Sequence, residues 1–334
     1  MSKSRHEKTV EMDRIWRPIK DQNAGYMFSL SDALANVETE HPGLLTSVSS
    51  GAMIVASDYS GQHKEATHEA YSFLVTTNVA LRPWLTKLDE FRREWLPDNR
   101  RISFKKLNEP MRWHALPSFL ELVSTLEGNL ISIMVDRRIG SFVPGGPAEA
   151  IQIFPDCFGF SPNPGTVEKI LRLASFVALI NAGLRGERQP SHWISDHDET
   201  LDTHAKREGF ARLAHYLTFG LTNWTNPADH VFGTTMSPHA PWWSEDLAAI
   251  PDLAAGAYCA TSSFHPAFFG TTFGHAFRSY RDVTNTRARE IGNWLATRSG
   301  KLRSVLLRLE MDAHDKVRAS AQTFIAQLYR RDTF

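Results

Sequence analysis

Three aspartates of this chain have the residue type and the spacing that a divalent-metal site for phosphate chemistry requires. Asp58 closely follows the apolar run of residues 53–56, and Asp136 directly follows the apolar run of residues 130–135. Asp252 lies in a small-residue stretch, residues 250–257, that is typical of the start of a helix. Mg²⁺ prefers oxygen ligands in octahedral geometry, and two such ions about 4 Å apart can hold both the attacking and the leaving oxygen of a phosphoryl transfer. The pattern predicts that Asp58, Asp136 and Asp252 bind Mg²⁺ or Mn²⁺.

Each of these aspartates also has a simpler explanation. An aspartate before a glycine turn, as in Asp58-Tyr-Ser-Gly, often only bonds its own backbone. Asp136 fits a solvated strand end, and an aspartate such as Asp252 in the first turn of a helix complements the helix dipole. The metal hypothesis therefore depends on the three carboxylates meeting in the folded chain.

Residues 196–199 (Asp-His-Asp-Glu) form the densest group of potential ligands in the sequence. They follow a short predicted strand, residues 192–195, whose end would lie near Asp58 in a mixed sheet. One of the two aspartates would then complete the metal site, and we favour Asp198 over Asp196. The alternative is that the acids form a capping box at the start of the next helix.

Basic and aromatic residues could hold a substrate. Lys105, Lys106 and Arg101 occur around a predicted strand at residues 101–107, and Arg137 follows Asp136. Such residues would contact phosphates in a salt-sensitive way, or they would only make the surface soluble. Trp242-Trp243 and the phenylalanines of residues 264–277 could stack on bases, although aromatic residues more often pack in cores. His239 is a further candidate acid or base.

The elements that would position these residues follow from periodicity. Strands are predicted at residues 53–56, 70–77, 101–107, 130–135 and 192–195, the first two as a hairpin. Helices are predicted over residues 81–95, 117–126, 166–183, 205–219, 287–295 and 305–329, with a further helix that begins at residue 245 or 252, and a loop over 222–243. Strands that come first as a hairpin and later alternate with helices indicate an α/β fold with a mixed sheet flanked by helices.

Composition sets the limits within which these hypotheses hold. The chain has 334 residues, is 42% hydrophobic and has a formal net charge of zero. Zero net charge argues against nonspecific coating of nucleic acid but allows a local basic groove. The two cysteines have no metal-type spacing. No apolar stretch has the length of a membrane span, so we expect a cytoplasmic protein with no membrane partner. We expect an N-terminal extension (residues 1–50), a core domain (51–262) and a helical C-terminal region (263–334) whose helix would pack on the domain or form a homo-oligomer.

Three segments resemble the uncharacterised DUF3800 family, whose members are similar to RNase H-like nucleases. The family's first motif, a strand ending Asp-Glu-Ser-Gly, is similar to Ser57-Asp-Tyr-Ser-Gly. Its closing helix motif, roughly Gln-x-Ala-Asp-Leu-x-Ala-Gly, is similar to residues 249–256, and a middle strand ending near Asp-Lys is similar to residues 135–137. The resemblance is scattered over about residues 52–260, and it implies an RNase H-like mixed sheet with a carboxylate cluster.

The chain departs from the family pattern at two acidic positions. Tyr59 replaces the glutamate of the first motif, and Ser103 replaces the glutamate of a Glu-x-Lys motif in the third strand, although Lys105 is kept. Glu121, on the following predicted helix, could supply a replacement carboxylate. The resemblance implies a divalent-metal-dependent nuclease acting on DNA or RNA. The alternative is a catalytically inactive scaffold or binding subunit of an antiviral or mobile-element assembly.

Overall fold

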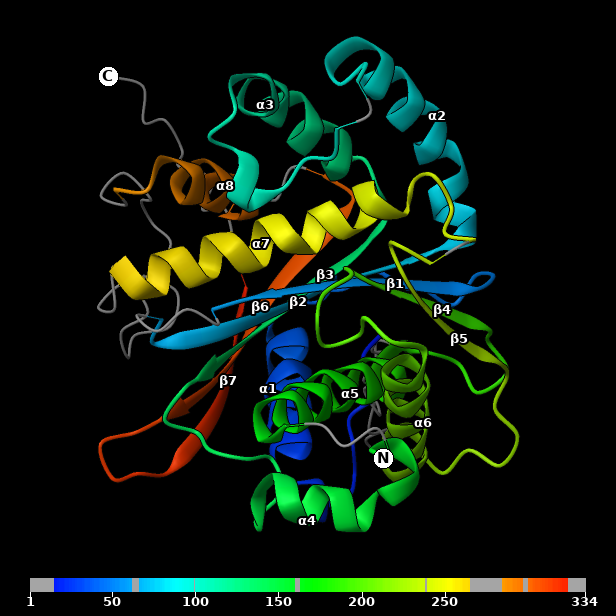
Figure 1. The fold of residues 1–334 in the computed structure, drawn as a ribbon, viewed down its shortest axis with the longest axis vertical. Coiled ribbons are helices and arrows are strands. Elements are labelled where there is room, and N and C mark those ends of the chain that lie inside the picture. The colour runs from blue at the N-terminus through cyan, green and yellow to red at the C-terminus, as the bar shows by residue number, and fades with distance from the viewer. Residues whose placement is uncertain are drawn as a thin grey trace, which may run out of the picture.

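A seven-stranded mixed sheet runs through the molecule (Figure 1). The computed structural model describes residues 15–61, 66–98, 100–159, 163–237, 239–264, 284–296 and 300–323. In spatial order the strands are β5 (His230–Thr234), β4 (Ser191–Ser195), β1 (Met53–Ser60), β2 (His68–Thr77), β3 (Gly128–Asp136), β6 (Leu302–Met311) and β7 (Val317–Thr323). The expected α/β class with a mixed sheet flanked by helices is confirmed.

The strand directions follow from the connections between the strands. Strand β2 is antiparallel to both of its neighbours, β1 and β3, and β6 and β7 form a further antiparallel pair. Strand β4 lies parallel to β1, β5 parallel to β4, and β6 parallel to β3. Parallel neighbours need a crossover connection, which is usually helical. The helices between β3 and β4 and between β4 and β5 serve this purpose.

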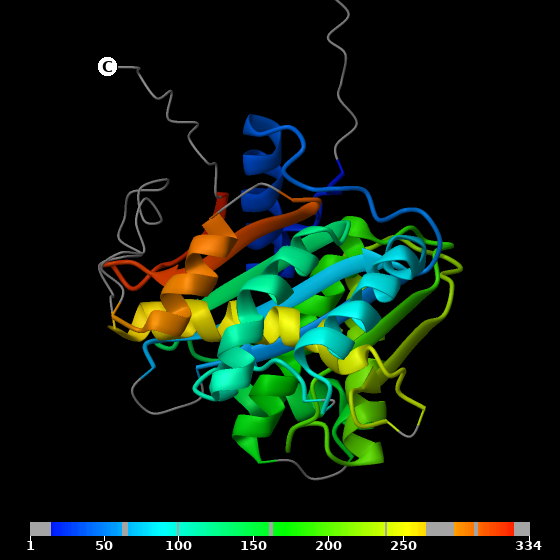
Figure 2. The same ribbon diagram turned by 90° about the horizontal axis from the view of Figure 1, so that it is seen from above.

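Helices cover both faces of the sheet (Figure 1). One layer contains α2 (Asn78–Trp95), α3 (Pro110–Ser124), α7 (Ser244–Phe264) and α8 (Thr286–Ala296). Figure 2 shows this layer from above, spread over the sheet from the cyan α2 to the orange α8. The opposite layer contains α1 (Tyr26–Glu40), α4 (Gly146–Ile153), α5 (Pro164–Leu184) and α6 (His204–Leu221).

The alternation of side chains along β1 assigns its residues to two separate cores. Ile54 and Ala56 pack under α7, whereas Met53 and Val55 pack against the layer of α1 and α5. Successive side chains of a strand point to opposite faces. The residues at the end of β1 therefore reach different layers, which decides the layout of the site.

Three predicted elements are wrong. Residues 101–107 are not a strand but part of the α2–α3 connection, with a single 3-10 turn, η2 (Phe104–Lys106). The predicted loop over 222–243 contains strand β5. The predicted C-terminal helix over 305–329 is wrong in its described part, because residues 302–323 form the hairpin β6–β7, which extends the central sheet; residues 324–329 lie outside the described residues. The helical C-terminal region and an oligomer contact through its helix are therefore not supported. The apolar run of β6 is buried on both faces, and such a run does not distinguish a strand from a helix by periodicity.

The predicted aromatic stretch of residues 264–277 lies almost entirely outside the described residues. Within the described part of the chain, no helix is long and apolar enough to cross a membrane.

Candidate functional site

A cleft of about 640 Å³ opens at the carboxyl ends of the parallel strands β1 and β4. Its walls come from the end of β1, the residues after β4, the start of α5, the middle of α7 and the η2 turn. Ligand sites in open α/β sheets commonly lie outside the carboxyl ends of the strands. The cleft contains Asp58 and Asp252, which are about two hundred residues apart in the chain.

The sheet itself places Asp196 beside Asp58. Ser57 is the register partner of Ser195, and the Asp196 amide still donates to the Ser57 carbonyl at 3.1 Å. Asp196, the residue directly after β4, is therefore the neighbour of Asp58 across this pair of parallel strands. We call Asp58, Asp196 and Asp252 the acidic cluster.

Helix α7 contributes the third carboxylate from above the sheet. Asp252 lies within α7 rather than in its first turn as expected, because the helix already begins at Ser244. Its Oδ2 accepts a hydrogen bond from the Phe104 amide at 2.8 Å. Gly256, one turn later in the same helix, allows this approach because a Cβ there would lie 2.3 Å from the Phe104 ring.

The charges of the acidic cluster oppose one another. Burial raises the pKa of Asp58 well above its usual value, and the negative charges of Asp252 and Asp196 raise it further. Burial also raises the pKa of Asp252, against the opposing effect of the Phe104 amide. Carboxylates that share a site disfavour each other's ionisation, so the cluster favours a nearby positive charge.

Arg101 supplies positive charge to this cluster. Its guanidinium donates to both oxygens of Asp196, from Nη1 to Oδ1 at 2.7 Å and from Nη2 to Oδ2 at 3.1 Å. The Thr235 hydroxyl also donates to Asp196 Oδ1, at 3.0 Å. The hydrogen bonds to Asp196 raise the pKa of Arg101, so the guanidinium is charged throughout the physiological range.

A second polar group lines the other side of the cleft. The Lys169 ammonium, on α5, lies 2.7 Å from Asp198 Oδ2 and 4.1 Å from the centre of the Tyr59 ring. Asp198 also accepts hydrogen bonds from the amide and the hydroxyl of Thr200, at 2.9 and 3.0 Å. Although burial alone would raise it, the pKa of Asp198 is lowered because of Lys169 and these donors. We call Tyr59, Lys169 and Asp198 the lysine group.

The predicted ligands are thus only partly brought together. Asp58 and Asp252 converge as predicted, but the strand-end aspartate of the acidic cluster is Asp196, whereas the favoured Asp198 belongs to the lysine group. Glu121 is exposed on α3 and does not line the cleft. Sequence reasoning missed Lys169, whose only signal is its position one turn into a helix that begins near the strand ends.

Asp136 lies away from the acidic cluster. Asp58 is opposite Ser72, Ser72 is opposite Ser132, and Asp136 is four residues beyond Ser132 along β3. Strand spacings of about 4.8 Å and rises of about 3.3 Å per residue put the two aspartates roughly 16 Å apart. The prediction that Asp136 binds the same metal as Asp58 is therefore wrong.

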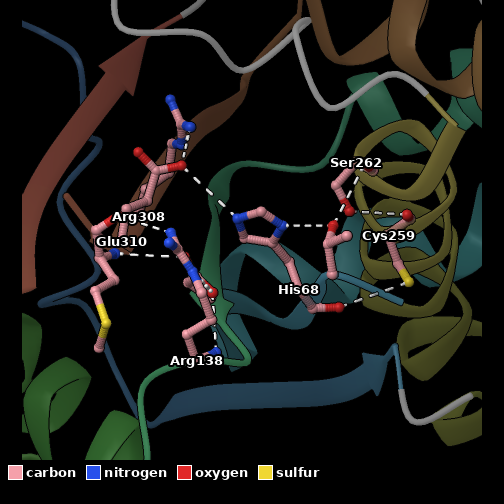
Figure 3. Close-up of polar contacts among 9 residues, drawn as sticks. His68, Arg138, Cys259, Ser262, Arg308 and Glu310 are labelled. Atoms are coloured by element: carbon pink, nitrogen blue, oxygen red, sulfur yellow. Dashed lines mark hydrogen bonds and ion pairs between the residues drawn. The ribbon is translucent and has the colours of Figure 1, made fainter. Parts of the chain in front are cut away.

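Asp136 instead belongs to a second pocket, of about 600 Å³, that also includes Arg137. Arg138 donates to the Asp136 carboxylate, and Figure 3 shows Arg138 near His68, Glu310 and Arg308. His68 lies between Glu310, with Nε2 3.7 Å from Oε1, and the Thr67 hydroxyl, 2.9 Å from Nδ1. These contacts connect the ends of β2, β3 and β6, which is a structural role.

Of the remaining residues predicted to bind substrate, some line the cleft and others lie outside it. Arg101 and Lys105 line the cleft, whereas Lys106, although exposed on η2, does not. His239, Trp242 and Trp243 are also outside the cleft wall. Lys206, which sequence reasoning did not consider, lies at the rim beside Asp202.

No protein-family model matches the chain, and no curated protein is significantly similar to it. In the described part of the molecule, no three His, Cys, Asp or Glu side chains are already arranged to hold a metal ion. The donor chemistry nevertheless fits a hard cation, because three mutually repelling carboxylates share one end of the cleft. In this structure the carboxylate of Asp196 is bonded to Arg101, and that of Asp252 is bonded to the Phe104 amide. Two of the three carboxylates therefore have protein donors as partners.

Proposed function

We propose that this protein is a divalent-metal-dependent nuclease of the RNase H-like type that cleaves phosphodiester bonds of DNA or RNA. The observation that carries the proposal is the convergence of Asp58, Asp196 and Asp252 at the carboxyl ends of two adjacent parallel strands and the helix above them. Acidic side chains from distant parts of a chain rarely share a half-buried site unless a cation balances them.

The strand arrangement supports the RNase H-like assignment. The spatial order β5-β4-β1-β2-β3, with three antiparallel strands followed by two strands parallel to the first, is the order expected of that fold. The strands β6 and β7 continue the sheet beyond β3. The DUF3800 resemblance agrees with the same assignment, since two of its three motifs supply Asp58 and Asp252.

Asp58, Asp196 and Asp252 are the residues that would hold Mg²⁺ or Mn²⁺. When bound, such a cation supplies charge neutralisation at the oxygens that attack and leave the phosphorus. The surrounding basic residues have a separate task. Lys105, Lys169 and Lys206 line the cleft, and in this proposal they contact the phosphates of a nucleic-acid strand. Backbone contacts of this kind hold a strand without reading its sequence.

One observation favours a second function. Arg101 already neutralises Asp196. A protein that kept the fold but lost the metal would be a binding or scaffold subunit, in which the basic residues of the cleft hold nucleic acid without cutting it. The two functions differ in whether a bound strand is cleaved when Mn²⁺ is added.

The test is a cleavage assay with end-labelled single-stranded, double-stranded and hybrid DNA and RNA, with Mn²⁺, Mg²⁺ or EDTA. We expect cleavage that requires the cation, and losses of at least about 100-fold in Asp58→Asn and Asp252→Asn, because even outer partners of metal ligands cost roughly 10- to 100-fold. Glu121→Gln, outside the cleft, is the matched control and should retain full activity. Asp136→Asn should do the same.

Full cleavage by both Asp58→Asn and Asp252→Asn would refute the assigned roles. Cation-independent binding of a strand without any cleavage would favour the scaffold function instead.

A further inference from the structure

Residues 100–107, which we call the crossing segment, contact the acidic cluster at two points. Arg101 forms the two-point pair with Asp196, and three residues later the Phe104 amide donates to Asp252. The backbone of the segment is held from the other side, because Arg112 Nε donates to the Arg101 carbonyl at 2.7 Å. Because Arg112 is itself buried in α3, it holds the backbone of Arg101 in place. A change of partner by Arg101 then needs only a rotation of its side chain.

The guanidinium and a divalent cation need the same oxygens. Both carboxylate oxygens of Asp196 accept from Arg101, and Oδ1 accepts in addition from Thr235. Mg²⁺ requires ligands at about 2.0–2.1 Å in near-octahedral geometry. Arg101 and Thr235 occupy three of the about four lone-pair positions of the Asp196 carboxylate. A cation that binds both oxygens therefore has to displace the guanidinium, and a cation at the remaining position of Oδ2 lies beside its positive charge.

Arg101 has another anionic partner available once it is released. Its side chain is 31% exposed and lines the same cleft as Lys105 and Lys169. Guanidinium forks bind phosphate with two parallel hydrogen bonds as well as they bind carboxylate. A strand phosphate in the cleft is therefore a natural replacement for Asp196.

We propose that Arg101 is a built-in competitor for the divalent cation, and that a nucleic-acid phosphate removes this competition by drawing the guanidinium off Asp196. The inference rests on the proposed function of the acidic cluster. It makes cation binding and strand binding cooperative: each one favours the arrangement that the other requires. Coupling of this kind is reciprocal, so it can be measured from the cation side.

The experiment is an electron paramagnetic resonance titration of Mn²⁺ into the full chain, in which the signal of free Mn²⁺ reports binding without any turnover. Wild type, Arg101→Gln and Arg101→Lys are titrated with and without a phosphorothioate oligonucleotide that resists cleavage. Arg100→Gln is the matched control, because the neighbouring Arg100 pairs with Asp98 and Glu109 and not with the cluster.

In the strand-free protein, we expect Arg101→Gln to bind Mn²⁺ at least about fivefold more tightly than wild type, the lower end of typical coupling. The oligonucleotide should tighten Mn²⁺ binding in wild type and in Arg100→Gln, and should have little effect in Arg101→Gln. Arg101→Lys should be intermediate because an ammonium cannot engage both oxygens.

Equal or weaker Mn²⁺ binding by Arg101→Gln, in a variant whose thermal unfolding matches wild type, would overturn the inference while leaving the nuclease proposal intact. If Arg101→Gln unfolds, Arg101→Lys decides the question by the same comparison. Binding of Mn²⁺ by Arg101→Gln but not by wild type would support the competition and would count against nuclease activity in wild type. Absence of binding in every variant would overturn both.

Discussion

Asp58 and Tyr59 are neighbours in β1 but act on opposite faces of the sheet. Asp58 interacts with Asp252 of α7, whereas the Tyr59 ring lies under Lys169 of α5. The exchange of an acid for Tyr59, read from the sequence as the loss of a ligand, therefore changes the lysine group and leaves the acidic cluster complete. A cation–π contact with a partly desolvated lysine is worth roughly 1–2 kcal/mol.

The correct strand-end aspartate could have been found from alternation. Asp196 directly follows β4 and its amide is still bonded to the Ser57 carbonyl, so it continues the alternation of the strand. Because it is three residues beyond the buried Trp193, its side chain points to the opposite face of the sheet. Asp198 lies two residues further, where the chain turns toward Leu201. Alternation no longer applies there, and only the folded chain shows that Asp198 meets Lys169.

His230, on the edge strand β5, gives a prediction about pH. Burial, with a smaller contribution from the charge of Arg185, lowers its pKa to about 4. The unfolded chain takes up a proton at its ordinary value of about 6.5, so stability present above pH 6.5 is lost as the pH falls toward 4. Urea unfolding at pH 7 and pH 4.5 should show a smaller loss for His230→Gln than for wild type, by on the order of 2 kcal/mol.

The control for this prediction is His204→Gln, since His204 is an exposed residue at the start of α6. It should reproduce the wild-type difference between the two pH values. A wild-type difference that His230→Gln leaves unchanged would mean that other groups cause it.

At the scale of elements, the crossing segment shows how tertiary contacts override local pattern. The alternation of Ile102 and Phe104 with polar residues predicted a strand, but the segment bonds to Asp252 and Arg112 instead of to a neighbouring strand. Both partners are distant in the sequence or lie in another element, so no local signal reports them. Helices α2, α5, α6 and α8 and strands β1 to β4 had clear periodicity, and their positions were predicted to within a few residues.

Gly256 tests whether the fit between α7 and the crossing segment matters. An alanine Cβ there would lie 2.3 Å from the Phe104 ring, so Phe104 and its hydrogen bond to Asp252 must shift. We expect Gly256→Ala to destabilise the protein by about 1–3 kcal/mol in urea unfolding, although alanine normally favours a helix over glycine.

Gly220→Ala in α6 is the matched control, because its Cβ would meet no atom within 4 Å. It should be neutral or stabilising by up to about 1 kcal/mol. Equal effects of the two substitutions would show that the packing against Phe104 is not important.

At the scale of the whole molecule, residues 302–323 are part of the central sheet. Strand β6 pairs with β3 over eight residues, from Gly128–Leu302 to Val135–Leu309. Leu306 joins the core under α7, and Val305, Leu307 and Leu309 join the opposite core. The division at residue 263 inferred from the sequence depended on reading this two-sided burial as a helix.

A chain truncated after residue 300 should therefore fail to fold as an independent domain. Its strand β3 would lose one neighbour along its whole length and expose the apolar surface that β6 covers. We expect rapid digestion in limited proteolysis and no cooperative thermal transition, whereas the intact chain resists the protease. If the truncated chain kept the melting temperature of the intact chain, the hypothesis of a separate C-terminal region would be supported again.

The backbone bond between Asp196 and Ser57 has a consequence for motion. Two of the three acids, Asp58 and Asp196, lie at the ends of two neighbouring strands, so the hydrogen bonds of the sheet fix the distance between their backbones. The third is carried by α7, a helix that can slide or tilt on side-chain contacts without breaking a strand ladder. If the cluster adjusts to ions of different radius, we expect α7 to move and the two strands to stay in place.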